Sequence, residues 1–430
     1  MYESNVRSYS RAFPRTFDRA VGAEIWDDQG ARYLDFLAGC GALNYGHNNP
    51  ALKEPLLDYI SRDAITLGLD LNTTAKDQFL EAFHECVLAP SALDYVVQFT
   101  GPTGTNAVEA ALKLARKVTG RSNIVSFTNG FHGVSIGALA VTGSEYNRNA
   151  AGMPLIGSTA LPYDNYFGSS INTVDYFKKL LNDKSSGLDT PAAVIVETVQ
   201  GEGGLNAACA LWLQELQAVC KHWNILLIVD DIQAGCGRTG SFLSFTDYNI
   251  KPDIVTLSKS LSGYGLPMSV VLIERSFDQW QPGEHNGTFR GNSHAFVTAT
   301  SALNNYWRTP DLKKEVDRKT NLLGQWLDVK LTQYPDQLLE KRGRGLMRGL
   351  VCADPTAAAA ITSTAFDNGL IIERSGAEDE VIKFLTPLTI EDAQLQEGLS
   401  ILDYALATVF RGDMNRSMYM AKPEGKAIHH

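Results

Sequence analysis

Three short apolar runs in the middle of the sequence constrain the fold most strongly. They cover residues 192–196, 225–229 and 254–257, and none of them alternates with polar residues. Uninterrupted runs of this length, rich in β-branched residues, are typical of strands buried on both faces of a parallel sheet. Residues 211–222 have helical periodicity and lie between the first two runs, which indicates a strand–helix–strand unit. We therefore predict an α/β fold with a mostly parallel central sheet and helices on both faces.

The rest of the chain divides around this centre. Residues 107–118 read as an amphipathic helix and 124–127 as the next strand, whereas 22–36 alternate like a small antiparallel ribbon. The region after about residue 320 mixes helices with short strands. We predict a large domain over 61–318 and a smaller α+β lobe built from both chain ends, 1–60 and 319–430.

Composition excludes several classes of protein. The 430 residues are 44% apolar and 20% charged, as in soluble globular proteins of more than one domain. The net charge of −10 comes without a basic block, so we expect no nucleic-acid partner. No apolar stretch is long enough to cross a membrane and the start resembles no signal peptide, so we expect a cytoplasmic protein. Six scattered cysteines without a C-x-x-C pair predict buried free thiols and no metal site.

Polar residues follow each apolar run at once. Glu197 and QGEGG follow the first, Asp230 and Asp231 the second, and Ser258 and Lys259 the third. In an open parallel sheet the ligand crevice lies outside the carboxyl ends of the strands, so these residues predict one shared site.

Lys259 and the two aspartates suggest covalent cofactor chemistry. A lysine in a partly desolvated cleft favours its neutral form, which attacks carbonyl groups to form a Schiff base, although an isolated lysine is more often a surface charge. A buried carboxylate needs a partner, and a protonated pyridine nitrogen would serve as well as a salt bridge or a helix cap. Strand alternation sends Asp230 and Asp231 to opposite faces, so only one can reach such a ring, and their positions alone leave the choice open.

Two further segments could complete the site. Gly104, Thr105 and Asn106 precede a helix and could offer amides and a hydroxyl to a phosphate, or simply cap the helix. Phe131 lies among glycines and could stack on a planar ring or belong to the core. His132 beside it is expected to be structural.

Six motifs in order connect these observations to a family. They are GAEIWDDQGARYLDFLAG…NYGHNNP, TGTNAVEAALKLAR, ETVQGEGG, VDDIQAGCGRTG, LSKSLSGYGLP and EHNGTFRGN, within roughly residues 20–390. Together they resemble the class III, or ω-amino acid, aminotransferases of fold type I. The resemblance implies pyridoxal 5′-phosphate as cofactor, with Lys259 forming the Schiff base and Asp230 at the pyridine nitrogen. It also implies that Gln233 lies near the ring hydroxyl and that Phe131 stacks on the ring.

The same resemblance implies an oligomer. Gly104 and Thr105 would hold the phosphate, and Thr288 would reach the phosphate bound in the neighbouring subunit. We therefore expect a homodimer or a larger homo-oligomer with active sites at the dimer interface.

Substrate recognition departs from the family pattern. Glu202 matches the acid that gates a substrate-binding arginine, but Val134 and Lys383 stand where many relatives carry arginines that hold carboxylates. A lysine lacks the bidentate fork of an arginine. Arg290 is a candidate replacement, or alternatively forms an interface salt bridge, so the predicted substrate set is Glu202, Arg290 and Lys383.

Within the family, LNYGHNNP, FTNGFHG and EHNGTFRGN are most similar to the diaminobutyrate–2-oxoglutarate aminotransferases. This implies amino and oxo acid substrates: L-glutamate and 2-oxoglutarate exchange an amine with aspartate β-semialdehyde and L-2,4-diaminobutyrate, a first step toward ectoine. The alternatives are another ω-amino acid aminotransferase of the ornithine or 4-aminobutyrate kind, an aminomutase or epimerase, and a non-catalytic protein on the same fold.

Overall fold

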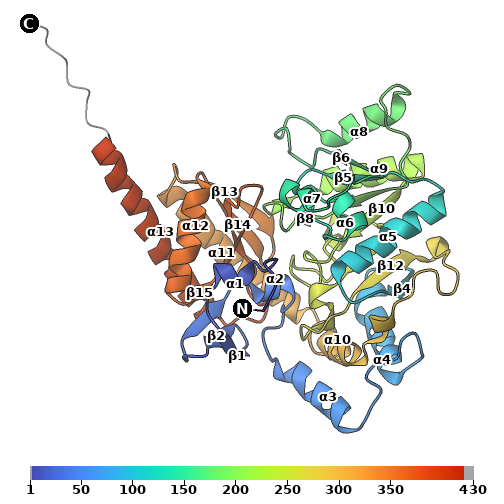
Figure 1. The fold of residues 1–430 in the computed structure, drawn as a ribbon, viewed down its shortest axis with the longest axis horizontal. Coiled ribbons are helices and arrows are strands. Elements are labelled where there is room, and N and C mark those ends of the chain that lie inside the picture. The colour runs from blue at the N-terminus through green and yellow to red at the C-terminus, as the bar shows by residue number, and fades with distance from the viewer. Residues whose placement is uncertain (1, 421–430) are drawn as a thin grey trace, which may run out of the picture.

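A seven-stranded sheet forms the centre of the larger part of the molecule (Figure 1). The computed structural model describes residues 2–420. All strands of this sheet run parallel except β12, which is antiparallel to both of its neighbours. In spatial order the strands are β4 (Tyr95–Phe99), β12 (Val270–Glu274), β11 (Ile254–Leu257), β10 (Leu226–Asp230), β7 (Ala193–Val196), β5 (Ile124–Phe127) and β6 (Ser158–Leu161).

Both faces of this sheet are buried, and alternate residues of each strand serve opposite faces. Ile195 and Ile228 pack on one face against α5 (Gly104–Thr119), accompanied by α6 (Ile136–Ala140). Val196 and Val229 belong to the larger core on the other face. That face is covered by α4 (Thr74–Phe83), α8 (Thr173–Asn182), α9 (Ala210–Trp223) and α10 (Ser293–Tyr306).

The smaller part of the molecule joins the two ends of the chain, which Figure 1 shows side by side in blue and in orange to red. Its first sheet has the order β1 (Phe17–Val21), β2 (Glu24–Asp27), β3 (Arg32–Asp35) and β15 (Leu370–Ile371). Its second sheet is antiparallel, with β13 (Leu338–Arg344), β14 (Met347–Cys352), β17 (Val381–Phe384) and β16 (Glu373–Ser375). The helices beside them are α11 (Asp311–Gln333), α12 (Pro355–Asp367) and α13 (Asp392–Met420).

Short elements connect these parts. The helices are α1 (Tyr9–Ala12), α2 (Ala38–Gly41), α3 (Pro50–Ser61) and α7 (Glu145–Asn149), and β8 (Val199–Gln200) pairs with β9 (Asn206–Ala207). The 3-10 turns are η2 (Thr246–Tyr248), η3 (Lys259–Ser262), η4 (Arg275–Phe277) and η5 (Thr288–Gly291), and η1 (His84–Leu88) is a π-helix.

The predicted α/β fold is confirmed, and the three central strands match the apolar runs to within one residue. The expected helix 107–118 starts earlier, at Gly104, so Gly104, Thr105 and Asn106 form its first turn. The lobe boundaries at residues 60 and 318 stay a prediction. Within residues 2–420 no helix combines the length and apolar content that crossing a membrane requires. The expectation of buried thiols was wrong for exposed Cys209 and for half-buried Cys40 and Cys86.

An aromatic cluster ties α4 to the sheet and to α10. Phe79 is fully buried, and its ring lies 5.9 Å from that of Phe99 and 5.8 Å from that of Phe296. Phe79→Ala should lower the free energy of unfolding by about 3–5 kcal/mol, because the cavity cannot collapse among rigid rings. Urea unfolding measures this, and Phe167→Ala, at a ring that is 53% exposed, is the matched control. A Phe79→Ala change no larger than that control would contradict the packing argument.

Candidate active site

Lys259 begins a strained turn at the end of β11. Its φ is +47°, a left-handed conformation that costs a non-glycine residue on the order of 1 kcal/mol. The residues on either side are anchored: Ser258 Oγ donates to the Met268 carbonyl at 2.9 Å, and Ser260 Oγ accepts from the Asn44 amide at 3.1 Å. The surrounding structure therefore holds the turn and keeps the Lys259 side chain half-buried in the crevice.

A turn from the N-terminal region brings Cys40 to this lysine. Lys259 Nζ lies 3.8 Å from Cys40 Sγ. The turn has positive φ at Ala38, Gly39 and Cys40. Asp35 fixes its start, because one carboxylate oxygen accepts the Leu37 and Ala38 amides, each at 2.8 Å.

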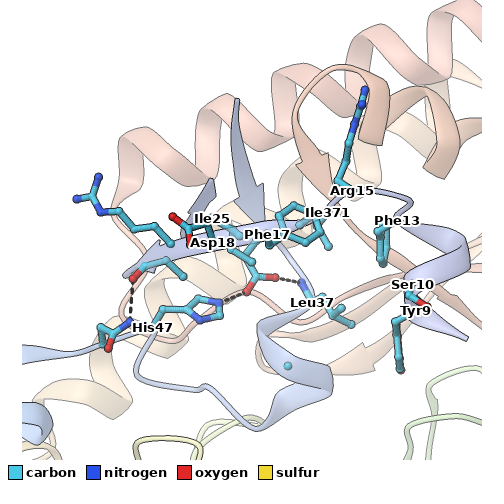
Figure 2. A pocket seen from close by; sticks show the side chains of 15 residues that line it. Tyr9, Ser10, Phe13, Arg15, Phe17, Asp18, Ile25, Leu37, His47 and Ile371 are labelled. Atoms are coloured by element: carbon cyan, nitrogen blue, oxygen red, sulfur yellow. Dashed lines mark hydrogen bonds and ion pairs between the residues drawn. The ribbon is translucent and has the colours of Figure 1, made fainter. Parts of the chain in front are cut away.

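A pocket of about 560 Å³ lies beside this turn (Figure 2). Figure 2 shows His47, whose Nε2 is 2.7 Å from the second carboxylate oxygen of Asp35, together with Leu37 and Tyr9 on the lining. Neither Lys259 nor Gln233 is among the lining residues, so this pocket does not include the predicted cofactor lysine.

The structure separates the two aspartates after β10. Asp230 Oδ2 lies 2.7 Å from His132 Nδ1, and Oδ1 accepts from Thr256 Oγ1 at 3.1 Å. Asp231 points to the opposite side and accepts the Ser244 amide at 2.9 Å. Burial raises the pKa of Asp231 to about 6. Burial opposes the charged form of His132, but the hydrogen bond with Asp230 and the negative charges of Asp230 and Glu197 together outweigh it, and the pKa of His132 is raised.

Glu197 is a buried acid that anchors the loops around the crevice. Its carboxylate accepts the Phe131 amide at 3.0 Å and the Gly201 amide at 3.3 Å. Burial raises the pKa of Glu197 to about 7, assisted by the nearby charge of Asp230. Glu197 thus holds the half-buried Phe131 in place from the end of β7.

Gln233, Glu202 and Lys383 meet in one cluster with a fourth member, Glu373, in which only Glu202 is half-buried and the other three are buried. Glu202 Oε1 accepts from Gln233 Nε2 at 3.0 Å and from Lys383 Nζ at 2.9 Å. Glu373 Oε1 lies 3.1 Å from Lys383 Nζ, and its other oxygen accepts from the Tyr9 hydroxyl at 3.1 Å. The Lys383 side chain is 0% exposed, so its charge is balanced entirely inside the protein.

The two glutamates of this cluster have pKa values that are shifted in opposite directions. Although burial opposes ionisation of Glu202, Lys383 and Lys259 more than offset it and lower the pKa of Glu202 to about 2. Burial likewise opposes the charge of Lys383, but the two glutamates raise its pKa. For Glu373, burial dominates and raises the pKa, with Glu202 adding to the effect.

The N-terminus of α5 forms a polar cradle. The first turn of a helix leaves amide groups without intrahelical partners. Thr105 Oγ1 lies 2.5 Å from Ser135 Oγ, and Ser135 Oγ donates to Glu109 at 2.6 Å. A Cβ at Gly133 would lie 2.5 Å from Thr105 Oγ1, so this approach requires glycine.

Two predicted residues, Thr288 and Arg290, and the departing position Val134 do not join the cluster. Thr288 is exposed on η5, and Val134 is 60% exposed. Arg290 donates to Asn286 Oδ1 at 3.1 Å. Among residues 2–420, no hydrogen bond joins Arg290 to Glu202 or Lys383 in this single chain, and the roles of Thr288 and Arg290 stay predictions.

The sequence reasoning missed several participants. Cys40, Glu373 and Tyr9 reach the site from the two chain ends, and their sequence neighbourhoods carry no periodic signal for it. The position of Glu197 after a buried strand predicts that it lies at the site. Nothing in the sequence predicts that it anchors Phe131. No group of three or more metal-ligating side chains exists among the residues that the structure describes.

The residues present fit pyridoxal phosphate. Gln233 Oε1 is buried without a hydrogen-bond partner in the described chain, as expected of a group that awaits a ligand hydroxyl. A Cβ at Gly201 would lie 1.7 Å from this oxygen, so the glycine leaves it room. The α5 amides suit a phosphate, and the amine of Lys259 suits a carbonyl.

Comparison with known proteins identifies the class. The family described as aminotransferase class-III matches residues 6–406, and the chain belongs to this family. The chain is 55% identical to the diaminobutyrate–2-oxoglutarate transaminase of Vibrio parahaemolyticus, covering 95% of this chain and 96% of that protein. It is 54% identical to the transaminase of the same name from Nocardia farcinica, covering 98% and 96%.

Solved structures agree on the fold. The ornithine aminotransferase from Toxoplasma gondii superposes with a TM-score of 0.82 at 27% identity, covering 96% of this chain and 94% of that one. A Bacillus anthracis aminotransferase gives a TM-score of 0.85 at 24% identity, covering 95% and 96%. The predicted family and fold type are thereby confirmed.

The raised pKa of Glu197 predicts a pH-dependent stability. With a pKa of about 7 in the folded chain and about 4.3 when unfolded, the folded state holds an extra proton between these values. Wild type should therefore lose on the order of 3 kcal/mol of unfolding free energy as pH rises across this range, relative to Glu197→Gln. Urea unfolding of cofactor-free protein at pH 5 and pH 8 measures the difference.

The control is Glu81→Gln, at an exposed glutamate on α4, which should keep the wild-type pH dependence. Parallel pH curves for wild type and Glu197→Gln would mean that Glu197 is ionised in the folded protein throughout.

Proposed function

We propose that this protein is a pyridoxal 5′-phosphate-dependent aminotransferase acting on L-2,4-diaminobutyrate. It exchanges an amino group between L-glutamate or 2-oxoglutarate and aspartate β-semialdehyde or diaminobutyrate. The observation that carries the choice of substrate is the identity of 54–55%, over nearly the whole chain, to relatives named diaminobutyrate–2-oxoglutarate transaminase. The buried cluster around Lys259 supports the chemistry.

The cofactor supplies a carbonyl that binds amines and a ring that accepts electrons from a deprotonated substrate carbon. Lys259 has two tasks: its Nζ binds the carbonyl covalently, and after release the same atom takes a proton from the substrate carbon. The anchored turn from Ser258 to Ser260 serves both tasks, because it fixes the start of the lysine side chain in the crevice.

Other residues hold and tune the cofactor. Asp230 offers a buried carboxylate to the ring nitrogen, and His132 and Thr256 fix its orientation. Gln233 Oε1 is free to accept from the ring hydroxyl, and Glu197 holds Phe131 for stacking. The amides at the start of α5, with the Thr105 hydroxyl, bind the phosphate.

Lys259→Ala tests the proposal directly. Wild type mixed with diaminobutyrate and 2-oxoglutarate should form glutamate, whereas Lys259→Ala should lose at least about 1,000-fold in rate, because covalent binding and proton transfer both depend on Nζ. The variant should also lose the visible absorbance of covalently bound cofactor. A glutamate assay and an absorbance spectrum measure the two effects.

Lys251→Ala is the matched control, because Lys251 is an exposed lysine shortly before β11. It should keep both the rate and the spectrum. Failure of wild type to form glutamate with cofactor bound would overturn the proposal, and conversion of diaminobutyrate without 2-oxoglutarate would identify a mutase instead.

We also propose that the working form is a homodimer or a larger homo-oligomer. Near the predicted interface residue Thr288 the chain exposes Ile65, Leu67, Leu69, Leu71 and Phe289, which we call the apolar patch and which are 38–63% exposed. The two segments lie side by side, because the Gly68 amide donates to the Gly291 carbonyl at 2.9 Å. Exposed apolar side chains on neighbouring segments support association with a second copy of the chain.

Leu71→Asp should weaken this association. Leu71 is 63% exposed, and a carboxylate buried at an interface without a partner is costly. Light scattering during gel filtration should give a lower mass than for wild type at equal concentration. Leu211→Asp is the control, because Leu211 is also 63% exposed but lies on α9, which Figure 1 shows far from α4. A monomeric wild type, or equal masses for both variants, would contradict the proposed interface.

A further inference from the structure

We propose that Glu373 binds the C2 ammonium group of diaminobutyrate and thereby selects diamino acids over ω-amino acids that lack this group. The inference rests on the proposed function, in which the amine on C4 reacts and the ammonium on C2 stays bound to the protein. Four bonds separate the two nitrogens of this substrate. The protein therefore needs an anion at that distance from the reacting amine.

The geometry places Glu373 within this reach. Lys259 Nζ lies 3.8 Å from Cys40 Sγ, and Cys40 Sγ lies 3.9 Å from Glu373 Oε1. The sum of these two distances is the greatest possible separation between Lys259 Nζ and Glu373 Oε1. Four bonds of about 1.5 Å span about 5 Å, and an ammonium–carboxylate hydrogen bond of about 2.8 Å extends the reach to about 8 Å. A substrate amine at the position of Lys259 Nζ can thus contact Glu373 through its second ammonium.

The charge balance of the cluster leaves room for one more cation. Glu202 and Glu373 both contact Lys383 Nζ, at 2.9 and 3.1 Å. When Lys259 acts as a base its amine is neutral, so Lys383 alone faces two carboxylates, of which Glu373 is buried and Glu202 half-buried. An ammonium group satisfies this surplus of acceptors, whereas a second carboxylate would increase it.

The Oε1 atoms of the two acids differ in their donors. Glu202 Oε1 accepts from Lys383 and Gln233 and also lies 3.6 Å from Cys40 Sγ. Glu373 Oε1 faces Lys383 and Cys40, and a thiol is a weak donor. The pKa shifts agree with this difference. Lys383 and Lys259 lower the pKa of Glu202 to about 2 against the effect of burial, whereas burial raises the pKa of Glu373.

Tyr9 fixes the remaining oxygen of Glu373. Its hydroxyl donates to Oε2 at 3.1 Å, which leaves Oε1 turned toward Cys40 and the lysine crevice. Glu373 itself is 8% exposed, so an ammonium that binds it is largely removed from water. Hydrogen bonds to charged groups in such places are among the stronger ones in proteins.

The competing explanation is that Glu373 only keeps Lys383 buried. The two roles differ in their effect on substrates, because 4-aminobutyrate equals diaminobutyrate without the C2 ammonium group. Glu373→Gln keeps the size of the side chain and an oxygen for Lys383 but removes the negative charge. A structural role predicts equal losses for both substrates, whereas ammonium binding predicts a loss for diaminobutyrate alone.

The experiment compares kcat/KM for the two substrates on the cofactor-loaded enzyme, with single-turnover absorbance changes where turnover is slow. In Glu373→Gln the ratio of diaminobutyrate to 4-aminobutyrate should fall about 10- to 100-fold. Glu373→Asp keeps the charge and should retain part of the preference. Glu378→Gln, at an exposed glutamate in the turn after β16, is the matched control and should leave the ratio unchanged.

Three outcomes overturn the inference. An equal loss for both substrates would limit Glu373 to holding Lys383. If Glu373→Gln does not fold, the wild-type ratio still decides, because equal use of both substrates would exclude ammonium selection. Either result leaves the proposed function intact as long as wild type forms glutamate from diaminobutyrate. A wild type that uses 4-aminobutyrate but not diaminobutyrate would instead overturn the proposed function together with the inference.

Discussion

The parallel pairing of β10 between β7 and β11 is the constraint on which the site depends. Its register aligns Val229 with Val196 and Asp230 with Thr256. Thr256 is therefore the neighbour that donates to Asp230, and Glu197 begins the loop beside them. A slip of one residue would send Asp230 to the other face and bring Asp231 to the crevice. Because both faces of the sheet are apolar, burial alone does not prevent this slip; the hydrogen bonds of Asp230 to Thr256 and of Asp231 to the Ser244 amide do, since a slip would break both.

The sheet supplies only half of the site, and the chain ends supply the rest. Asp35 fixes the turn that brings Cys40 to Lys259, and β17 and β16 contribute Lys383 and Glu373. These groups meet only when the smaller lobe packs against the carboxyl edge of the large sheet. The position of the lobe thus controls which charges face the substrate, while the sheet controls the cofactor residues.

This division explains what could be predicted from sequence. The cofactor candidates Asp230 and Lys259 follow strands that periodicity locates within a residue, and a single rule about strand ends predicts that they converge. Cys40, Glu373 and Tyr9 follow no such rule, because they are distant in sequence and depend on lobe packing and on a turn with positive φ. Periodicity also could not decide between Asp230 and Asp231. Strand alternation shows that the two side chains point to opposite faces of the sheet, but not which of them faces the crevice.

A lysine at position 383 changes which charges are available to a substrate. A lysine has three donors and no fork, and the ammonium of Lys383 is enclosed by Glu202 and Glu373 with no exposed surface. A buried cation that is held by two acids is a fixed structural charge unless one of the acids moves away. Lys383 can therefore contact a substrate carboxylate only after Glu202 or Glu373 releases it. The two acids that face this one lysine are the surplus of negative charge on which the proposed preference for a second ammonium group rests.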